Sequence, residues 1–339
     1  MNILIVKLSS LGDVVHAMAA VQDIQQAHPK AQIDWVVERG FAPLVRRCQG
    51  VHRAIECDLR RWRTSLLGAN TLRAWHQFKT ELQQESYDAV IDLQGLSKSA
   101  LVSWLAQPNP QGLRYSMANQ TEGSGFEAPS RWVADVAITL PTHCHAITRS
   151  RQLCAAALGY AIPSYMSFGL VRRMDKAQLA IKIEAFSKGL KGVVALVHGT
   201  SRTDKQWPLL HWRALADRLH HAGYGVVVPH GNEVEKQTSH DIAHGLPDVH
   251  VWPNLPLDAL TDALSTCTGV IGVDSGLSHI AVALNLPHVQ IYNFDTAWRT
   301  GPLALNRPRQ CSVFATPTPS VDAVWQAWER VLFTDIVNA

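Results

Sequence analysis

Four short polar segments follow stretches of the chain that are typical of buried β-strands, and they carry the side chains best suited to chemistry. The first segment is Lys7-Leu-Ser-Ser-Leu-Gly-Asp13, which follows the apolar run Asn2–Lys7. Asp13 is ionised at neutral pH and can accept the proton of a hydroxyl group, as a general base does. The same residues also fit the start of a helix, with Ser9 or Ser10 as the N-cap and Asp13 in the first turn. The sequence alone leaves both functions open.

The second segment runs from His198 to Lys205 and follows the apolar stretch 193–198. It contains the hydroxyl groups of Thr200 and Ser201 and the ammonium group of Lys205. Hydroxyl donors and a cation suit the oxygens of a phosphate group. The alternative is a solvated polar loop, which has a similar composition.

The third segment, Pro229 to Glu235, ends in an acidic residue. Acidic residues at such strand ends accept hydrogen bonds from a ribose, and Glu235 is a candidate for a ribose or base contact. Glu235 equally fits the first turn of a helix, where a carboxylate is favoured by the helix dipole.

The fourth segment is the most specific, because a buried strand leads directly into Asp274-Ser-Gly-Leu-Ser-His279. A helix that starts here directs the backbone amides of Ser275, Gly276 and Leu277 outward and offers an anion site. Gly276 also permits a ligand to approach the backbone closely. The alternatives are that Asp274 is only an N-cap and that His279 is a core histidine.

A basic cluster, Arg60-Arg-Trp-Arg63, differs in kind from these segments. Residues 46–79 contain eight Lys and Arg against Glu56 and Asp58, a local charge of +6 (eight minus two) in a chain whose net charge is +3. The cluster predicts a site for an anionic, amphiphilic partner at a membrane surface. A solvated helix face and a single-stranded nucleic-acid site are the alternatives. Apolar residues are interleaved with the cations: Trp62, Leu66, Leu67, Trp75 and Phe78.

Several signatures of other protein classes are missing from the sequence. The first strand end lacks G-x-G-x-x-G, no G-x-x-x-x-G-K-[ST] occurs, and no D-x-D pair offers ligands for a metal on a diphosphate. The six cysteines show neither C-x-x-C nor zinc spacing, which indicates reduced thiols in a cytoplasmic protein. No apolar stretch approaches the ~18 residues of a membrane-spanning helix. We therefore expect no metal, no cofactor and no membrane span, and the near-neutral charge argues against a dedicated nucleic-acid binder.

Short β-rich runs alternate with helical periods along the whole chain, with a connection from Tyr160 to Gly192 between two such series. This alternation predicts parallel sheets with helices on both faces, in two doubly wound α/β domains that face a cleft. Ligands of such sheets bind beyond the carboxyl ends of the strands, where the four polar segments lie. Residues 107–141 are rich in Pro, Gly, Asn and Ser and are expected to form loops with short strands, and 321–332 to form a last amphipathic helix.

In combination these segments resemble the ADP-heptose:lipopolysaccharide heptosyltransferases, a family of GT-B glycosyltransferases. The resemblance covers nearly the whole chain and is carried by ILIVKLSSLGDVVH, DWVVERGF, RRWR, YDAVIDLQGLSKSAL, HGTSRTDKQWPLLHW and VIGVDSGLSHIAVAL. The combination of SSLGD, RRWR, DLQGL and DKQWP is most similar to the members that add the first heptose to Kdo2–lipid A.

The resemblance implies a role for each matching residue. Asp13 matches the proposed general base, and Lys205 and the residues around it match the group that holds the donor diphosphate. The residues implied in donor binding are Thr200, Ser201, Lys205, Glu235, Asp274, Ser275, Gly276 and His279. The residues implied in acceptor binding are Ser9, Ser10, Gly12, Arg60, Arg61, Arg63 and Gln94. Three departures stand out: Ser275 replaces the usual Thr, His230 replaces an aromatic residue beside the base, and the loop 292–299 differs.

The resemblance also implies the organisation and activity of the chain. Residues 1–170 form an acceptor-binding domain, 171–191 a linker, and 192–320 a donor-binding domain, while the helix at 321–339 packs back on the first domain. The implied reaction is an inverting, metal-independent transfer of L-glycero-D-manno-heptose from ADP-heptose to a Kdo residue of Kdo2–lipid A, at the cytoplasmic face of the inner membrane. The alternatives are a later-acting core heptosyltransferase, a GT-B-type nucleotide-sugar epimerase or hydrolase, and a non-catalytic protein that binds a nucleotide sugar or an anionic lipid.

Overall fold

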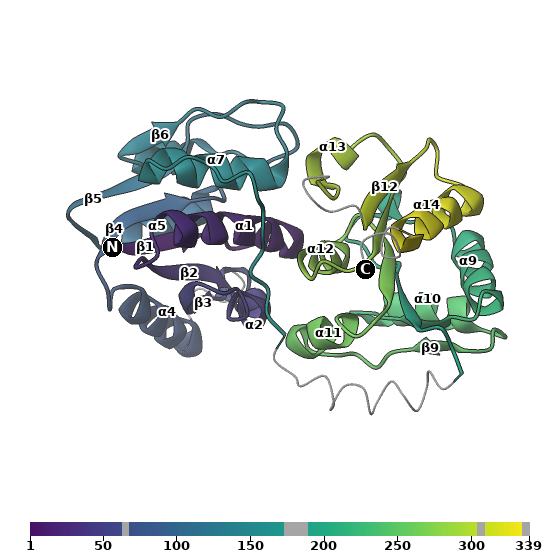
Figure 1. Cartoon of the computed structure of the whole chain (residues 1–339). Coiled ribbons are helices and arrows are strands. Elements are labelled where there is room, and N and C mark those ends of the chain that lie inside the picture. Colours follow the sequence, from purple (N-terminus) through teal and green to yellow (C-terminus); the bar gives the residue numbers. More distant parts are fainter. Residues whose placement is uncertain (63–67, 173–188, 304–308, 334–339) are drawn as a thin grey trace. The chain divides into compact units, whose positions relative to one another are not determined.

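The computed structural model describes residues 1–62, 68–172, 189–303 and 309–333. The chain divides into two compact units, 1–171 and 172–339, each built on a six-stranded sheet (Figure 1). Most of the connection predicted at 171–191 lies outside the described residues, and the division between the units falls at 171/172.

The first unit contains a parallel sheet in the order β3-β2-β1-β4-β5-β6. Its strands are β1 (Asn2–Val6), β2 (Gln32–Glu38), β3 (Val51–Cys57), β4 (Tyr87–Asp92), β5 (Pro108–Met117) and β6 (Val136–Ile138). Its helices are α1 (Leu11–Ala27), the 3₁₀ turn η1 (Arg39–Phe41), α2 (Ala42–Val45), α3 (Leu59–Trp62), α4 (Ala69–Leu82), α5 (Ser97–Leu105), α6 (Ala128–Val133) and α7 (Ala146–Leu158).

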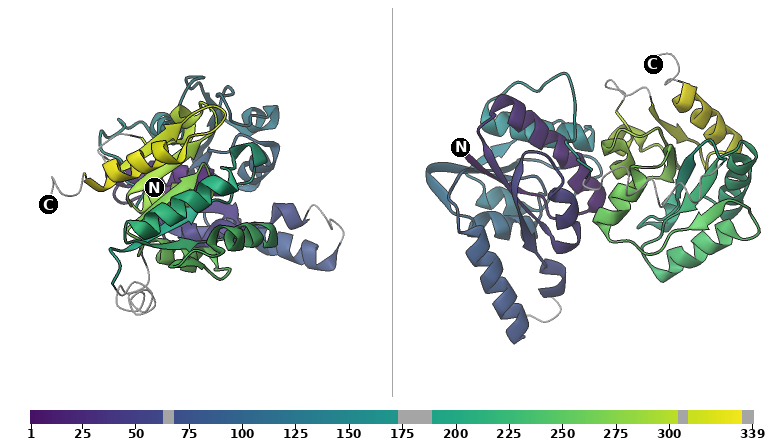
Figure 2. Two further views of the ribbon diagram at one scale, coloured as in Figure 1. Left: turned by 90° about the vertical axis from the view of Figure 1, so that its right-hand side faces the viewer. Right: turned by 60° about the horizontal axis from the view of Figure 1, so that its bottom comes forward.

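The second unit repeats this topology in the order β12-β11-β10-β7-β8-β9, again with every strand parallel (Figure 2). Its strands are β7 (Val193–Val197), β8 (Gly225–Val228), β9 (Val249–Val251), β10 (Gly269–Val273), β11 (His288–Tyr292) and β12 (Gln310–Phe314). Its helices are η2 (Thr203–Lys205), α9 (Leu209–His221), α10 (Glu233–Ala243), α11 (Leu257–Leu264), α12 (Gly276–Ala283), α13 (Ala297–Thr300) and α14 (Val321–Phe333).

The two central strand pairs, β1/β4 and β7/β10, mark the points at which the strand order reverses. At such a point the loops that follow the two neighbouring strands diverge to opposite faces of the sheet and leave a ligand-sized crevice at the carboxyl ends. The prediction of doubly wound α/β units is therefore confirmed, and the polar segments that end in Asp13, Lys205 and His279 follow β1, β7 and β10, three of these four strands.

The apolar runs seen in the sequence form the core of each unit. In the first unit, Leu4 and Val6 of β1 are fully buried and pack in a cluster with Phe78 of α4. In the second unit, Trp212 of α9 and Trp328 of α14 belong to one core cluster with β7, β10 and β11. Burying side chains of this size provides most of the free energy that holds each unit together.

The prediction that the last helix packs back on the first domain is wrong for the described part of that helix. The apolar stripe of α14, which includes Val324, Trp328 and Val331, is buried in the core of the second unit. The helix packs against β11, β12 and α9. The stripe therefore packs on the outer strands β11 and β12 of the second sheet.

Two strands differ from the sequence-based expectation: β5 is longer than expected, and β12 was not expected. β5 spans ten residues within the region expected to be mainly loops, despite two prolines, and pairs with β4. Pro108 and Pro110 lie in its first three positions, where the loss of backbone donors interferes least with the ladder. The short strand β12 closes the second sheet and was not expected.

Candidate functional site

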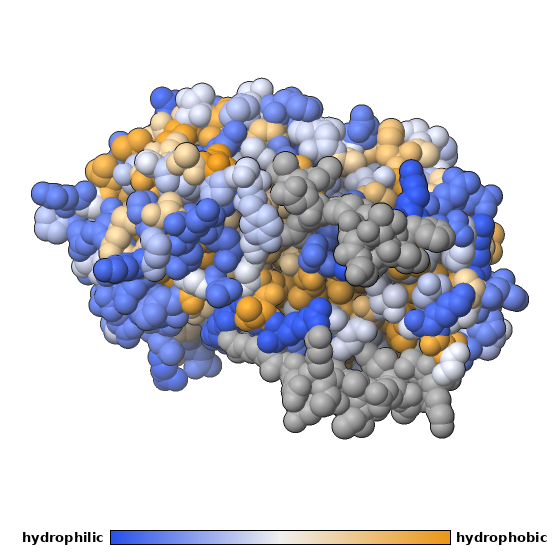
Figure 3. Space-filling view, in the orientation of Figure 1, coloured by the Kyte–Doolittle hydropathy of each residue, from blue (hydrophilic) through white to orange (hydrophobic). Residues whose placement is uncertain are grey.

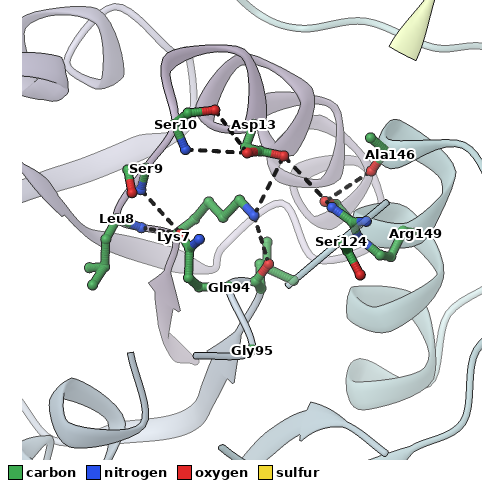
Figure 4. A network of polar contacts seen from close by, with 12 residues as sticks. Lys7, Leu8, Ser9, Ser10, Asp13, Gln94, Gly95, Ser124, Ala146 and Arg149 are labelled. Atoms are coloured by element: carbon green, nitrogen blue, oxygen red, sulfur yellow. Dashed lines mark hydrogen bonds and ion pairs between the residues drawn. The ribbon is translucent and has the colours of Figure 1, made fainter. Parts of the chain in front are cut away.

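The carboxylate of Asp13 lies at the carboxyl end of β1, in the first turn of α1, and its two oxygens have different surroundings (Figure 4). Oδ2 accepts hydrogen bonds from the backbone N–H and the hydroxyl of Ser10, at 3.2 and 2.9 Å. Oδ1 faces the ammonium group of Lys7 at 3.9 Å and the guanidinium of Arg149 at 3.7 Å. Asp13 thus caps the helix through one oxygen and meets two cations through the other, so the capping role and the chemical role coexist.

The charges around Asp13 decide its protonation state. Burial disfavours the ionised carboxylate, but Lys7, Arg149 and His16 together hold the pKa of Asp13 well below its usual range. Lys7 is itself almost completely buried, and this burial lowers its pKa, opposed by the charge of Asp13. The Asp13 side chain nevertheless remains 35% exposed, so an ionised oxygen is within reach of a ligand.

The loop that follows β4 is bound to the loop that follows β1. The side-chain oxygen of Gln94 accepts hydrogen bonds from the backbone N–H groups of Leu8 and Ser9, both at 3.1 Å. Lys98, in the first turn of α5, donates to the hydroxyl of Ser9 at 2.9 Å. The predicted residues Ser9, Ser10, Gly12, Asp13 and Gln94 therefore gather at the reversal point of the first sheet.

Asp92, the last residue of β4, holds the loop that follows this strand in place. Its carboxylate accepts from the backbone N–H groups of Gln94 and Gly95 at 2.8 and 3.0 Å and from the hydroxyl of Ser99 at 2.9 Å. Complete burial raises its pKa to about 6 although these hydrogen bonds oppose the shift. Asp92 is thus a structural carboxyl group that fixes Gln94 beside Ser9.

The predicted basic cluster is only partly described. Arg61 is exposed on α3, whereas the side chain of Arg60 and the whole of Arg63 lie outside the described residues. The lower left of the face shown in Figure 3, where α4 lies in Figure 1, is mainly hydrophilic. The cations of α4, Arg73 and Lys79, are exposed.

The aromatic residues interleaved with these cations pack inward rather than toward solvent. Trp62, Trp75 and Phe78 contact one another, with ring centroids 5.5 to 5.9 Å apart, and Trp62 and Phe78 are buried. A pocket of about 410 Å³ adjoins this cluster. Its lining is mainly apolar, with Lys98 among its residues: Leu59, Trp62, Thr71, Leu72, Trp75, Lys98 and Leu101.

In the second unit, the reversal point brings together Lys205 and Asp274. The ammonium group of Lys205 contacts Oδ2 of Asp274 at 2.5 Å, and both side chains are largely buried. Oδ1 of Asp274 accepts from the Gln290 side chain at 3.3 Å and lies 3.3 Å from Nε2 of His279. Thr200 donates its hydroxyl proton to the backbone carbonyl of Asp274 at 3.3 Å. The predicted residues Thr200, Lys205, Asp274 and His279 therefore form one cluster.

Asp274 is ionised for a clear physical reason. Burial disfavours its charge, but His279 and Lys205 outweigh burial and hold its pKa well below the usual range. The N-cap of α12 is Ser275, so the alternative that Asp274 is only an N-cap is wrong. The hydroxyl oxygen of Ser275 is buried and has no hydrogen-bond partner within the described part of the chain. Gly276 is the first residue of the helix, as expected for an anion site at its amino end.

Glu235 lies in the first turn of α10 and accepts a hydrogen bond from the backbone N–H of Gly231 at 2.7 Å. A Cβ atom at Gly199 would lie 2.8 Å from the Glu235 carboxyl carbon, so the absence of a side chain at position 199 lets this carboxylate reach the loop after β7. Ser201 is exposed on that same loop. The first of the four predicted segments thus lies in the first unit, and the other three follow the neighbouring strands β10, β7 and β8 of the second unit.

Several residues of these clusters were missed by sequence reasoning. Arg149 belongs to α7, far from every motif, and no local pattern indicated that it meets Asp13. Gln290 is a buried polar residue between Val289 and Ile291 in β11, a signal that could have identified it. Asn293, in the divergent loop 292–299, donates to the backbone carbonyls of Asp204 and Gln206 at 2.9 and 2.8 Å and so holds the turn that carries Lys205.

Over the described ranges, no three His, Cys, Asp or Glu side chains gather closely enough to hold a metal ion. Within the same residues, none of the helices has the length and apolar character needed to cross a bilayer.

Comparison with known proteins agrees with this geometry. Lipopolysaccharide heptosyltransferase 1 of Escherichia coli K12 is 35% identical over 293 residues, which are 86% of this chain and 88% of the relative. The protein of that name from Pseudomonas aeruginosa is 37% identical over 306 residues, 89% of this chain and 81% of the relative. The solved structure of E. coli heptosyltransferase WaaC with ADP has a TM-score of 0.84 at 31% identity, covering 98% of this chain and all (100%) of that one.

A second WaaC structure, with ADP-2-deoxy-2-fluoro heptose, has a TM-score of 0.77 at 32% identity and covers 97% of this chain and 99% of that one. The family model of glycosyltransferase family 9 (heptosyltransferase) matches residues 75–324, well over half of the chain. The chain is therefore a member of glycosyltransferase family 9, a family of heptosyltransferases.

Proposed function

We propose that this protein transfers L-glycero-D-manno-heptose from ADP-heptose to a Kdo residue of Kdo2–lipid A, with inversion at the sugar carbon. The observation that carries the proposal is the ionised, partly exposed carboxylate of Asp13 at the carboxyl end of β1. The 33–37% identity to proteins named lipopolysaccharide heptosyltransferase 1 supports the choice of donor and acceptor.

In the proposed step, Asp13 removes the proton of the acceptor hydroxyl as its oxygen forms a bond to C1 of the heptose. The bond between C1 and the β-phosphate oxygen breaks with its electron pair, and ADP departs. Negative charge therefore grows on the β-phosphate. Lys205 and the backbone amides at the start of α12 are assigned to this charge, because preorganised donors at a developing anion lower the barrier.

The second unit supplies the donor site in this proposal. Asp274 fixes the ammonium group of Lys205, and the unpartnered hydroxyl of Ser275 is free to donate to a phosphate oxygen. Thr200 and Ser201 line the same loop, and His279 is placed to contact the heptose or the phosphates. Glu235 is assigned to the ribose. The solved structures of WaaC with ADP and with ADP-2-deoxy-2-fluoro heptose support a nucleotide-sugar donor.

The first unit supplies the acceptor site. We assign Arg60, Arg61 and Arg63 to the acidic groups of the acceptor, and Ser9, Ser10, Gly12 and Gln94 to the walls around its reacting hydroxyl. The exposed side chains of Leu72 of α4 and Leu101 of α5 line one pocket, and α4 also carries the exposed cations Arg73 and Lys79. This combination of apolar side chains and positive charge favours peripheral contact with the anionic cytoplasmic face of the inner membrane.

The decisive experiment incubates the purified protein with ADP-heptose and Kdo2–lipid A and measures the mass of the lipid product. The expected product is one heptose heavier. Consumption of ADP-heptose without an acceptor would instead identify an epimerase or hydrolase, and donor binding without turnover would identify a binding protein. Turnover only with an acceptor that already carries heptose would identify a later-acting core enzyme.

The membrane contact is tested separately by sedimentation with vesicles. Vesicles with about 30% anionic lipid should retain the protein, and neutral vesicles should not. The double variant Leu72→Ser with Leu101→Ser should bind less, while Leu210→Ser, which changes an exposed leucine of α9, is the matched control. Equal retention of all variants would remove this surface from the proposal.

A further inference from the structure

Two arginines of α7 each face an aspartate of α1, and the two pairs differ in geometry. Arg151 binds Asp23 with two hydrogen bonds, Nε to Oδ2 at 2.6 Å and Nη2 to Oδ1 at 3.0 Å, and also donates to the backbone carbonyl of Pro163 at 2.7 Å. Both side chains are nearly inaccessible to solvent. A buried bidentate pair of this kind holds two helices together.

The second pair, Arg149 with Asp13, is loose. The closest approach, Nη2 to Oδ1, is 3.7 Å, which is longer than a hydrogen bond. Nη1 of Arg149 instead donates to the hydroxyl of Thr121 at 3.1 Å, and Thr121 is bonded to Ser124 at 2.9 Å. The guanidinium is thus anchored by a neighbouring loop, and only its charge acts on the carboxylate.

Charged groups reach Asp13 from every element packed around it. Lys7 approaches from the end of β1, His16 from the next turn of α1 and Arg149 from α7. Lys98 of α5 and the carboxyl group of Asp92 lie beyond Lys7 and act on it. Of the two cations at ion-pair distance from Oδ1, Lys7 also donates to the backbone carbonyl of Leu93 at 3.0 Å.

We propose that Arg149 is a positioning residue for the base: anchored at Thr121, its charge keeps Oδ1 of Asp13 directed away from Ser10 and available to the acceptor hydroxyl. This inference rests on the proposed function, because it assigns Arg149 a role through Asp13. It also explains why the contact is long, since a direct hydrogen bond would occupy the lone pair that receives the proton. After the transfer, the proton on Oδ1 faces two cations, which favours its release to solvent.

The test compares three variants of the full chain, Arg149→Met, Arg149→Lys and Arg151→Met. We expect Arg149→Met to lower kcat by at least about 10-fold with little change in the KM for ADP-heptose. Arg149→Lys, which restores the charge, should recover most of this loss. Arg151→Met should lower the melting temperature and leave kcat of the folded protein near the wild-type value.

A direct readout is the titration of the Asp13 carboxyl carbon, observed by NMR with ¹³C-labelled aspartate. The pKa of Asp13 should rise by about one unit or more in Arg149→Met and stay unchanged in Arg151→Met, because an opposite charge at this range has an effect of that size. Should Arg149→Met fail to fold, Thr121→Val tests the anchor alone and should lower kcat severalfold.

The outcomes separate this inference from the proposed function. If Asp13→Asn retains turnover, the base assignment and this inference both fail. If Asp13→Asn is inactive while Arg149→Met or Thr121→Val has wild-type kcat, the proposed function stands and the role of Arg149 is wrong. An equal loss of kcat in Arg149→Met and Arg151→Met would show that both arginines only hold α7 in place.

Discussion

Each unit has an ionised aspartate at the reversal point of its sheet, but the two carboxylates are held differently. Asp274 is 4% exposed, and Lys205 contacts it directly at 2.5 Å. Asp13 is 35% exposed, and its two cations stay at 3.7 and 3.9 Å from Oδ1. In both cases positive neighbours outweigh burial and lower the pKa of the carboxyl group.

This difference in exposure and in cation contacts determines what each carboxylate can do. Asp274 is saturated by Lys205, His279 and Gln290, so its charge serves to place other groups, above all the ammonium of Lys205. Asp13 is saturated at Oδ2 only and can exchange a proton at Oδ1. On the same topology, Asp274 therefore holds Lys205 in place, whereas Asp13 keeps an exposed oxygen that suits its proposed role as the base.

The largest expected effect comes from removing the carboxylate of Asp13, the proposed base. Asp13→Ala should lower kcat by about 10³-fold or more, since a positioned general base contributes about 10²–10⁴-fold. ADP-heptose binding, measured by calorimetry, should stay nearly unchanged, because Asp13 belongs to the other unit. Asp13→Asn is the control that keeps the bond from Ser10 and the shape of the helix start. Near-normal turnover in either variant would remove Asp13 from the mechanism.

The second-largest expected effect comes from replacing Lys205, whose ammonium group is held in place by Asp274. Lys205→Met should lower kcat by about 10²-fold and also weaken donor binding, because it removes a cation from the developing charge on the phosphate. Asp274→Asn should have a smaller effect in the same direction if Asp274 only places Lys205. A larger loss of kcat in Asp274→Asn than in Lys205→Met would show that Asp274 does more than place Lys205, and the proposed distinction between Asp274 and Asp13 would fail.

A smaller effect is expected at the basic cluster. Arg60→Ala combined with Arg61→Ala should raise the KM for the acceptor by about 30-fold, because each cation near an anionic lipid surface contributes about 1 kcal/mol. The KM for ADP-heptose should change much less. Arg218→Ala, a surface arginine of α9, is a control for the loss of positive charge. An unchanged acceptor KM would indicate that the cluster is only a solvated helix face.

The smallest expected effect is a difference between the two units in how their stability depends on pH. Burial keeps His198 and His288 neutral and lowers the pKa of each to about 4, so the unfolded state takes up protons first as the pH falls from 7.5 toward 4. Stability contributed by these groups is present above the ordinary histidine pKa and is lost on acidification. Burial raises the pKa of Asp92 to about 6, which has the opposite sign: its protonated native form is favoured as the pH falls.

Hydrogen exchange of the full chain measures this difference. Between pH 7.5 and 6, protection of β7 and β10, after correction for the intrinsic rate, should fall roughly fourfold for each buried histidine. Protection of β4 should not fall. His198→Asn should remove part of the dependence in the second unit. Equal pH dependence in the two units would show that these buried groups do not control their stabilities.

Much of the fold follows from local patterns in the sequence. The strand-like runs at 2–7 and 193–198 and the helix expected at 321–332 agree with β1, β7 and α14 to within one residue, because strong apolar patterns define each of them. The region that contains β5 was misjudged because Pro and Gly indicate loops, although the first positions of a strand tolerate proline. The partner of α14 was misplaced because an amphipathic stripe shows that a helix is buried but not against which sheet.

The candidate site was predicted where a strand end and a motif coincide. Asp13, Lys205 and Asp274 all follow strands, so the topology brings them to the reversal points. Arg149 and the Gln290–Asp274 contact could not be predicted, because they depend on side chains from distant elements that meet only in the folded chain. The interleaved tryptophans were assigned to a surface because composition alone does not distinguish the two faces of a short helix.

The placement of α14 has a consequence for synthesis of the chain. The strands of the first sheet and the helices that cover them lie within residues 2–158, so this unit can fold while the rest is still being translated. The second unit lacks Trp325, Trp328 and Val331 from its core until the last helix has left the ribosome. Its sheet therefore keeps an uncovered apolar face until α14 has been translated, and we expect chaperone contacts on the nascent chain to concentrate there.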